Sequence, residues 1–137
     1  MHRHRILMAT VLLTALVLVG CATVAEPRAS QNAGGFTEIG VDELAEMIDR
    51  GELTLINVHI PYAGEIPGTT LHIAFDEIST RTDLLPATDT PIVLYCRSGS
   101  MSQSAATELA ALGYTHIIEA EGGMVAWEAS GRELVFR

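Results

Sequence analysis

The chain has 137 residues, enough for one domain with a substantial core and short accessory segments. It carries 17 carboxylates against eight basic residues, all of them arginine, and has a net charge of −9. Such an acidic chain argues against nucleic acid as a partner, because affinity for a phosphate backbone comes mainly from neutralising Lys and Arg side chains.

Residues 1–20 have the features of an export signal. Arg3 and Arg5 give a basic start, and the apolar stretch 6–19 is shorter than the roughly 20 residues that a transmembrane helix needs. The end of this stretch and the two residues after it, Leu18-Val19-Gly20-Cys21, resemble the bacterial lipobox, whose cysteine becomes the lipidated first residue of the mature protein. We therefore expect a lipoprotein signal peptide over 1–20, lipidation of Cys21, and a domain held on a membrane outside the cytoplasm. An ordinary signal peptide or an uncleaved anchor is the alternative.

Residues 21–35 are rich in Ala, Ser, Gly, Gln and Asn, which predicts a flexible tether between the lipidated cysteine and a domain over 36–137. A first strand is expected at 36–39. Val41, Leu44, Ala45 and Ile48 then recur at the spacing of a buried helix face. Gly51 follows as a C-terminal cap, and the apolar run 53–58 predicts a covered parallel strand.

The rest of the chain continues to alternate between strands and helices. Residues 57–70 are rich in Gly and Pro and predict irregular structure. The expected elements that follow are a short strand at 71–75, an acidic helical turn at 76–78, a loop at 83–90, a strand at 92–95, a helix at 103–112, a strand at 114–118 and a short helix around 124–127. This alternation predicts an α/β fold with a mostly parallel five-stranded sheet between helices.

Cys96 directly follows the apolar strand 92–95 and precedes six small or polar residues. A thiol between a strand end and a helix start lies where loop amides and the helix dipole favour negative charge. If Cys21 is lipidated, Cys96 has no partner for a disulfide and is a free thiol. A buried core cysteine is the alternative, but the position at a strand end beside Gly and Ser favours a reactive thiolate.

Three stretches of the chain together resemble the rhodanese-like domain family. The stretches are Cys96-Arg97-Ser98-Gly99-Ser100-Met101-Ser102, which is similar to the active-site loop; Gly64-Glu65-Ile66-Pro67-Gly68-Thr69, which is similar to the Gly-His-Ile-Pro-Gly-Ala turn; and Gly113-Tyr114 with Gly122-Gly123 and Ala126-Trp127, which are similar to the closing strand and helix. They occur in the family's order, and the resemblance covers about residues 36–135.

The resemblance implies a three-layer rhodanese-like sandwich with Cys96 at the bottom of a pocket. Its thiolate would be the catalytic nucleophile, taking sulfane sulfur from a donor such as thiosulfate and passing it from a persulfide to a thiol or another nucleophile. The residues expected to surround the substrate are those of the loop: Arg97, Ser98, Gly99, Ser100, Met101 and Ser102. Their backbone N–H groups would stabilise the sulfur, and Ser100 or Ser102 would cap the helix. No cofactor is implied, and a protein partner is compatible with the reaction.

Several residues depart from the family's pattern. Asn57-Val58-His59 stands where Asp-Val-Arg is common, so a buried Asp–Arg pair is absent and the neighbouring pocket wall is expected to differ. Glu65 replaces a frequent His, and Met101 stands where Arg is frequent, which removes a cation that would help to bind thiosulfate. These changes leave the fold expectation intact but leave the sulfur donor open. Tyr62 is a candidate lining residue of the reshaped wall.

Two other classes of function remain open from the sequence. A carrier or interaction module would accept persulfide from a protein partner rather than turn over small donors. A cysteine-based phosphatase or arsenate reductase is disfavoured, since the position of the oxyanion-clamping Arg holds Ser102. No metal site is expected, because His59, His72 and His116 lack ligand spacing.

Overall fold

The computed structural model describes residues 30–51 and 53–137. The expected signal peptide, Cys21 and most of the expected tether lie outside the described residues. The part of that tether that is described forms a turn, in which the Gly35 N–H donates to the Asn32 carbonyl at 3.0 Å. Within the described ranges, no helix combines the length and the apolar character needed to cross a membrane.

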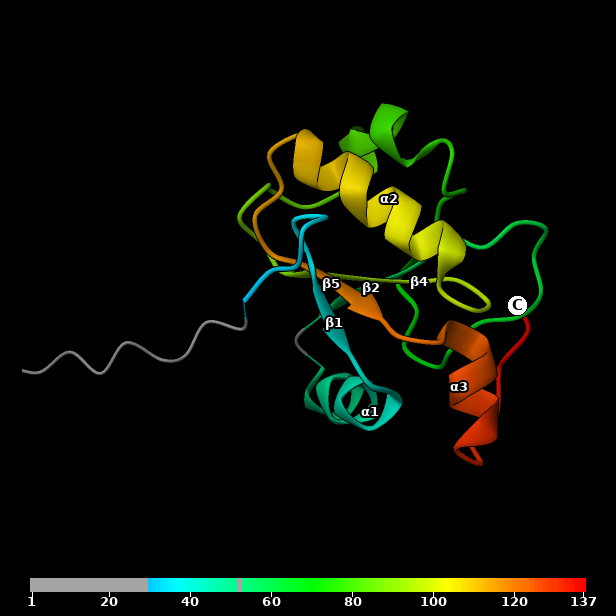
Figure 1. Ribbon diagram of the computed structural model, residues 1–137. Coiled ribbons are helices and arrows are strands. Elements are labelled where there is room, and N and C mark those ends of the chain that lie inside the picture. Colours follow the sequence, from blue (N-terminus) through cyan, green and yellow to red (C-terminus); the bar gives the residue numbers. More distant parts are fainter. Residues whose placement is uncertain (1–29, 52) are drawn as a thin grey trace, which may run out of the picture.

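A single five-stranded sheet forms the centre of the domain, and all of its strand pairs are parallel. Its order is β1-β5-β4-β2-β3 (Figure 1). The strands are β1 (Thr37–Ile39), β2 (Thr54–Asn57), β3 (Leu71–His72), β4 (Ile92–Tyr95) and β5 (Ile117–Ala120). All four residues of β4 are buried, as expected of a central parallel strand covered on both faces.

Helices cover both faces of the sheet (Figure 1). On one face α2 (Ser100–Ala111) packs with the 3-10 turn η1 (Ile78–Thr80), and their core includes Leu94 and Leu109. On the other face α1 (Val41–Arg50) and α3 (Gly123–Ala129) enclose a second core, which contains Leu44, Tyr95 and Trp127. The expected three-layer α/β sandwich is therefore confirmed.

Helix α1 shows how the local sequence sets an element. Asp42 and Glu43 lie in its first turn, where carboxylates favour the helix dipole. Gly51 ends it at φ 70°, a conformation that favours glycine, and donates its N–H to the Ile48 carbonyl at 3.0 Å. Leu44 is fully buried on the face toward the sheet. The amphipathic pattern and the glycine stop predicted these bounds.

Four elements differ from the expectation. Helix α2 begins at Ser100, three residues before the expected start, because Gly99 already turns the chain into the helix. Strand β5 begins at Ile117 instead of residue 114, since the Tyr114 N–H donates back to Leu109 at the end of α2. Strand β3 has only two residues, and a second 3-10 turn, η2 (Thr82–Leu84), enters the expected loop. The shift of β5 places Glu119 inside the sheet.

Candidate functional site

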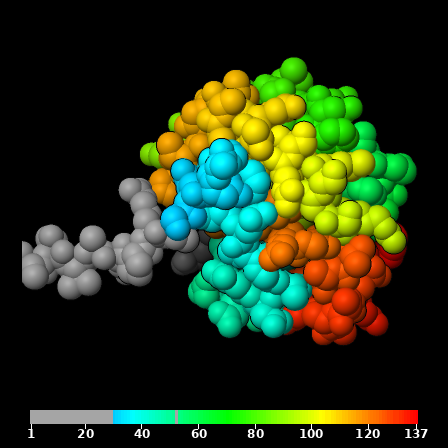
Figure 2. Space-filling model, viewed as in Figure 1, coloured from blue at the N-terminus to red at the C-terminus, as the bar shows by residue number. Residues whose placement is uncertain are grey.

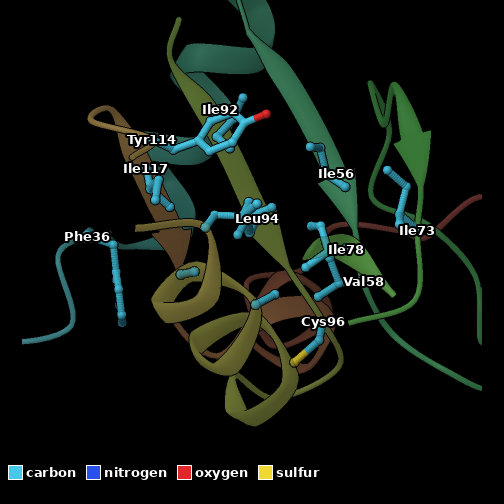
Figure 3. Packing of buried hydrophobic residues seen from close by; sticks show 13 residues of the cluster. Phe36, Ile56, Val58, Ile73, Ile78, Ile92, Leu94, Cys96, Tyr114 and Ile117 are labelled. Atoms are coloured by element: carbon cyan, nitrogen blue, oxygen red, sulfur yellow. The ribbon is translucent and has the colours of Figure 1, made fainter. Parts of the chain in front are cut away.

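Cys96 lies at the carboxyl end of β4, between the sheet and the first turn of α2. Its side chain is a free thiol with only 1% of its surface exposed. Figure 3 shows its sulfur pointing away from the apolar cluster of Leu94 and Val58, toward a neighbouring helix. The thiol is thus a buried group that belongs to the edge of the core, with its sulfur directed at polar neighbours.

The loop after Cys96 curls around the sulfur. Gly99 adopts φ 112°, where other residues are strained, and its N–H donates to Cys96 Sγ at 3.1 Å. Gly99 is also the N-cap residue of α2, and neither Ser100 nor Ser102 makes a capping hydrogen bond there. The expected capping by Ser100 or Ser102 is therefore wrong. The sulfur itself accepts hydrogen bonds at the helix start, as a capping oxygen does elsewhere.

Ser102 is fully buried in the first turn of α2, beside the sulfur. Its hydroxyl lies 3.4 Å from Cys96 Sγ, 3.0 Å from the Gly99 carbonyl and 2.5 Å from Glu119 Oε1. Burial raises the pKa of the Cys96 thiol, but the Ser102 hydroxyl and the N–H groups of Ser102, Gly99 and Ser98 together outweigh it. The net result is a pKa below the ordinary thiol value, which favours the thiolate.

Helix α3 holds the Cys96 loop from the other side. The N–H groups of Met124 and Val125 donate to the carbonyls of Cys96 and Arg97, each at 3.0 Å. Gly123 makes this approach possible, because a Cβ there would lie 2.1 Å from the Cys96 carbonyl oxygen. Figure 2 shows the orange residues at the start of α3 directly against the yellow-green start of α2. The closing Gly-Gly motif thus has a structural role at the thiol.

The six expected loop residues differ in their exposure to solvent. Gly99 and Ser102 are buried at the sulfur, whereas Arg97, Ser98 and Ser100 are exposed. Met101 is half-buried and packs against the core around α2, so it lines the helix base and not an open anion site. Arg97 is therefore the cation of this loop that faces solvent.

Glu119 was missed by the sequence analysis. It is fully buried in β5, paired in register with Leu94 of β4 and Glu38 of β1. Its Oε1 meets Ser102, while its Oε2 has no hydrogen-bond partner among the described residues. A lone carboxylate in the apolar run Ile117-Ile118-Glu119-Ala120 was the signal available in the sequence, because buried charges are rare unless they are used.

Asn57 holds the segment after β2 in place through its side-chain amide. Its Nδ2 donates to the Gly64 carbonyl at 3.1 Å, and its Oδ1 accepts from the His59 N–H at 3.0 Å. Hydrogen bonds of the neutral Asn57 side chain thus stand where the family commonly has an Asp–Arg ion pair. Burial lowers the pKa of His59, and Arg97 and His72 lower it further. Tyr62 stacks edge-on against the His72 ring at 5.5 Å.

Glu65, in the Gly-rich turn, has a cation partner that the sequence did not reveal. Its Oε2 accepts from Arg137 Nε at 2.7 Å, and Arg137 also donates to the Thr69 carbonyl at 2.9 Å. An antiparallel bridge between Glu65 and Val135 holds the last residues of the chain against this turn. Glu65 therefore has a structural role where the family often has His.

Other features of the described residues lie away from the thiol. A cavity of about 620 Å³ is lined by Thr37, Pro91, His116 and Ile117 among others, at the amino ends of the strands and so opposite Cys96. No group of three or more His, Cys, Asp or Glu side chains in the described ranges could hold a metal ion.

Comparison with known proteins identifies the family of the chain. The model of the rhodanese-like domain matches residues 40–130. The chain is 30% identical over 102 residues to a sulfurtransferase of Allochromatium vinosum, covering 72% of this chain and 94% of that protein. It is 29% identical over 106 residues to the thiosulfate sulfurtransferase GlpE of Pseudoalteromonas translucida, covering 74% of this chain and 98% of that protein.

The fold agrees with the sequence comparison. A crystal structure of a rhodanese-related protein from Thermoplasma volcanium superposes with a TM-score of 0.64 at 26% identity, covering 74% of this chain and all of that one. With a family match over most of the domain and this shared architecture, the chain belongs to the rhodanese-like domain family.

Proposed function

We propose that the protein is a membrane-tethered sulfurtransferase that carries sulfur on Cys96 outside the cytoplasm. Sulfur transfer in general follows from the family and from relatives named as sulfurtransferases. One observation supports the role of Cys96: its buried sulfur accepts hydrogen bonds from the Gly99 N–H and lies beside the Ser102 hydroxyl. This arrangement stabilises a thiolate, the form that attacks sulfur.

The reaction has two balanced displacements. The Cys96 thiolate attacks the outer sulfur of a sulfane donor such as thiosulfate, so that an S–S bond forms as the donor's own S–S bond breaks and sulfite leaves with the electron pair. A thiolate acceptor then attacks the terminal sulfur of the persulfide. The new S–S bond forms on the acceptor, and Cys96 recovers its electron pair as thiolate.

The loop residues divide the work of this reaction. The N–H groups at the start of α2 stabilise negative charge on Cys96 and on the added terminal sulfur. Arg97 is exposed beside this loop and attracts an anionic donor from solvent. Met101, in the place of a frequent Arg, supplies no second cation, which favours donors of lower charge than the thiosulfate dianion, such as a thiol persulfide.

A persulfide carrier is the second candidate. The observation that favours it is the 1% exposure of Cys96, which limits direct approach by bulky acceptors. A partner protein that docks over the loop would then deliver or remove the sulfur. Rapid turnover with small donors and thiols supports the enzyme, whereas transfer that needs a partner supports the carrier.

The phosphatase alternative receives no support from the site. Ser102 stands at the clamp position and is buried against Cys96 and Glu119, where it offers no charge to an oxyanion.

Mass spectrometry of the reduced domain tests the role of Cys96. After exposure to thiosulfate or polysulfide, we expect a mass gain of one sulfur atom located on the peptide that contains Cys96. Cys96→Ser is the control and should gain none. If the wild-type protein gains no sulfur with any donor, the sulfurtransferase proposal fails.

Membrane attachment through Cys21 is tested separately. Expression of the full chain with a labelled fatty acid should give a labelled, membrane-associated protein, and Cys21→Ala should abolish the label. Unlabelled wild-type protein would contradict the lipid anchor without bearing on Cys96.

A further inference from the structure

Glu119 is a buried ionisable group at the thiol with no role in the reaction described above. It is fully buried, and its Oε2 has no hydrogen-bond partner within the described part of the chain. Its Oε1 lies 2.5 Å from the Ser102 hydroxyl, which in turn lies 3.4 Å from Cys96 Sγ. The two contacts connect the three side chains in series, from Glu119 on β5 through Ser102 to the Cys96 sulfur.

The Ser102 hydroxyl has one proton, which limits what it can do. If Glu119 is ionised, it can only accept, so the hydroxyl proton points to Glu119 and cannot support the thiolate. If Glu119 is protonated, the carboxyl O–H donates to Ser102 Oγ, and the hydroxyl proton is free to point at Cys96 Sγ. The Gly99 carbonyl, 3.0 Å from the hydroxyl, competes for this proton, but a thiolate is charged and is the stronger acceptor. The Ser102 hydroxyl can therefore donate a hydrogen bond to the thiolate, and keep its hydrogen bond with Glu119, only when Glu119 carries a proton.

The surroundings of Glu119 favour that protonated form. Burial raises its pKa above the usual range, the bond from Ser102 offsets part of the rise, and Glu38 and Glu121 add to it. Glu38 faces it from β1 and Glu121 follows it along the chain, while the first turn of α2 holds no acidic residue. Cys96, at the end of β4, adds a further negative charge when it ionises. This charge disfavours ionisation of Glu119.

We propose that Glu119 is a positioning residue that acts in its protonated form, donating to Ser102 so that the Ser102 hydroxyl donates to the Cys96 thiolate. A single negative charge is then held on sulfur, and no charge is buried without a hydrogen-bond donor. The proposal rests on the function of Cys96 as a thiolate nucleophile. When Glu119 ionises, the Ser102 hydroxyl donates to Glu119 and no longer to Cys96, which raises the pKa of Cys96. The two groups therefore titrate as a coupled pair.

Infrared spectroscopy tests the protonation of Glu119 directly. The difference spectrum between the protein and Glu119→Gln at neutral pH should contain the C=O stretch of a protonated carboxylic acid. That band should persist to higher pH in the wild type than in Cys96→Ser, because linkage between the two groups is reciprocal. Absence of the band, or identical pH dependence in both proteins, overturns the proposal. Glu108→Gln on the exposed face of α2 is the matched control.

The pH dependence of Cys96 alkylation by iodoacetamide gives a second readout. Glu119→Gln keeps a neutral donor and should leave the midpoint close to that of the wild type, whereas Ser102→Ala removes the hydroxyl donor and should raise it by about one to two pH units. A midpoint that falls in Glu119→Gln would mean that the native residue is ionised and would overturn the proposal. If Ser102→Ala does not fold, the infrared comparison still decides.

The two proposals fail in different ways. Alkylation and infrared spectra report the thiolate without any sulfur donor, and the mass measurement reports sulfur transfer. If Cys96 gains no sulfur while the Glu119 band and the alkylation midpoints behave as expected, the function fails and the coupling stands. If Cys96 gains sulfur but the band is absent, the coupling fails alone.

Discussion

Gly123→Ala is expected to disturb the thiol loop from outside it. A Cβ at Gly123 would lie 2.1 Å from the Cys96 carbonyl oxygen, 2.9 Å from its carbon and 3.1 Å from the Arg97 carbonyl carbon. All three atoms belong to the backbone, so no side chain can move aside to make room. The start of α3 must therefore separate from the loop.

The magnitude follows from the bonds that hold this contact. Moving α3 away from the loop stretches two backbone hydrogen bonds. They run from the N–H groups of Met124 and Val125 to the carbonyls of Cys96 and Arg97, each at 3.0 Å. Loss of two such bonds, together with the left-handed φ of 51° at Gly123, destabilises the domain by roughly 2–5 kcal/mol. That is a large part of the roughly 5–15 kcal/mol expected for a domain of this size.

Urea unfolding measures the free energy, and iodoacetamide alkylation measures the Cys96 pKa. Gly131→Ala is the matched control, since Gly131 also has a positive φ of 84° but nothing lies within 4 Å of its Cβ position. It should cost only the backbone strain, roughly 1–2 kcal/mol, and leave alkylation unchanged. If Gly123→Ala loses no more stability than Gly131→Ala, the inferred support of the loop by α3 is refuted.

Two further substitutions test contacts that hold the Gly-rich turn. Tyr95→Phe leaves the buried Ile66 N–H without its acceptor and should cost about 1–3 kcal/mol of unfolding free energy. Burial raises the Tyr95 pKa to about 12, so its contribution to stability is present below pH 10 and is lost as pH rises toward 12; Tyr95→Phe should flatten this alkaline loss in urea titrations. Arg137→Gln leaves the poorly exposed Glu65 carboxylate without its cation and should cost roughly 1 kcal/mol, since Arg137 itself is largely exposed. An unchanged urea midpoint in either variant would contradict the corresponding contact.

The elements with a strong local pattern could be predicted from the sequence. Helix α1 has an apolar stripe, acidic first turn and glycine stop, and strand β4 is a short apolar run behind a proline. These features act within a few residues, so they need no tertiary information. The position of Cys96 at the end of β4, and with it the thiolate hypothesis, followed from the same local reading.

The start of α2 and the bounds of β5 could not be placed in this way. Ser100 begins α2 because Gly99 turns early and the Cys96 sulfur accepts at the helix start. Tyr114 and Thr115 look strand-like but donate to Leu109 and Thr88 instead. At Thr115 the partner lies 27 residues away along the chain, and at α2 the short Gly99–Cys96 bond depends on a loop that α3 holds in place, so intrinsic preference alone does not set these bounds.

The sequence by itself determined the order of elements, the buried strand and the lone thiol at its end, because periodicity and glycine placement act locally. Only the tertiary structure decided what surrounds that thiol. Glu119 reaches Ser102 across 17 residues, Gly123 meets the Cys96 carbonyl across 27, and Arg137 pairs with Glu65 across 72. Parallel strands bring Glu119 to the edge of the sheet where Cys96 and Ser102 lie, and burial there raises the pKa of the Glu119 carboxyl.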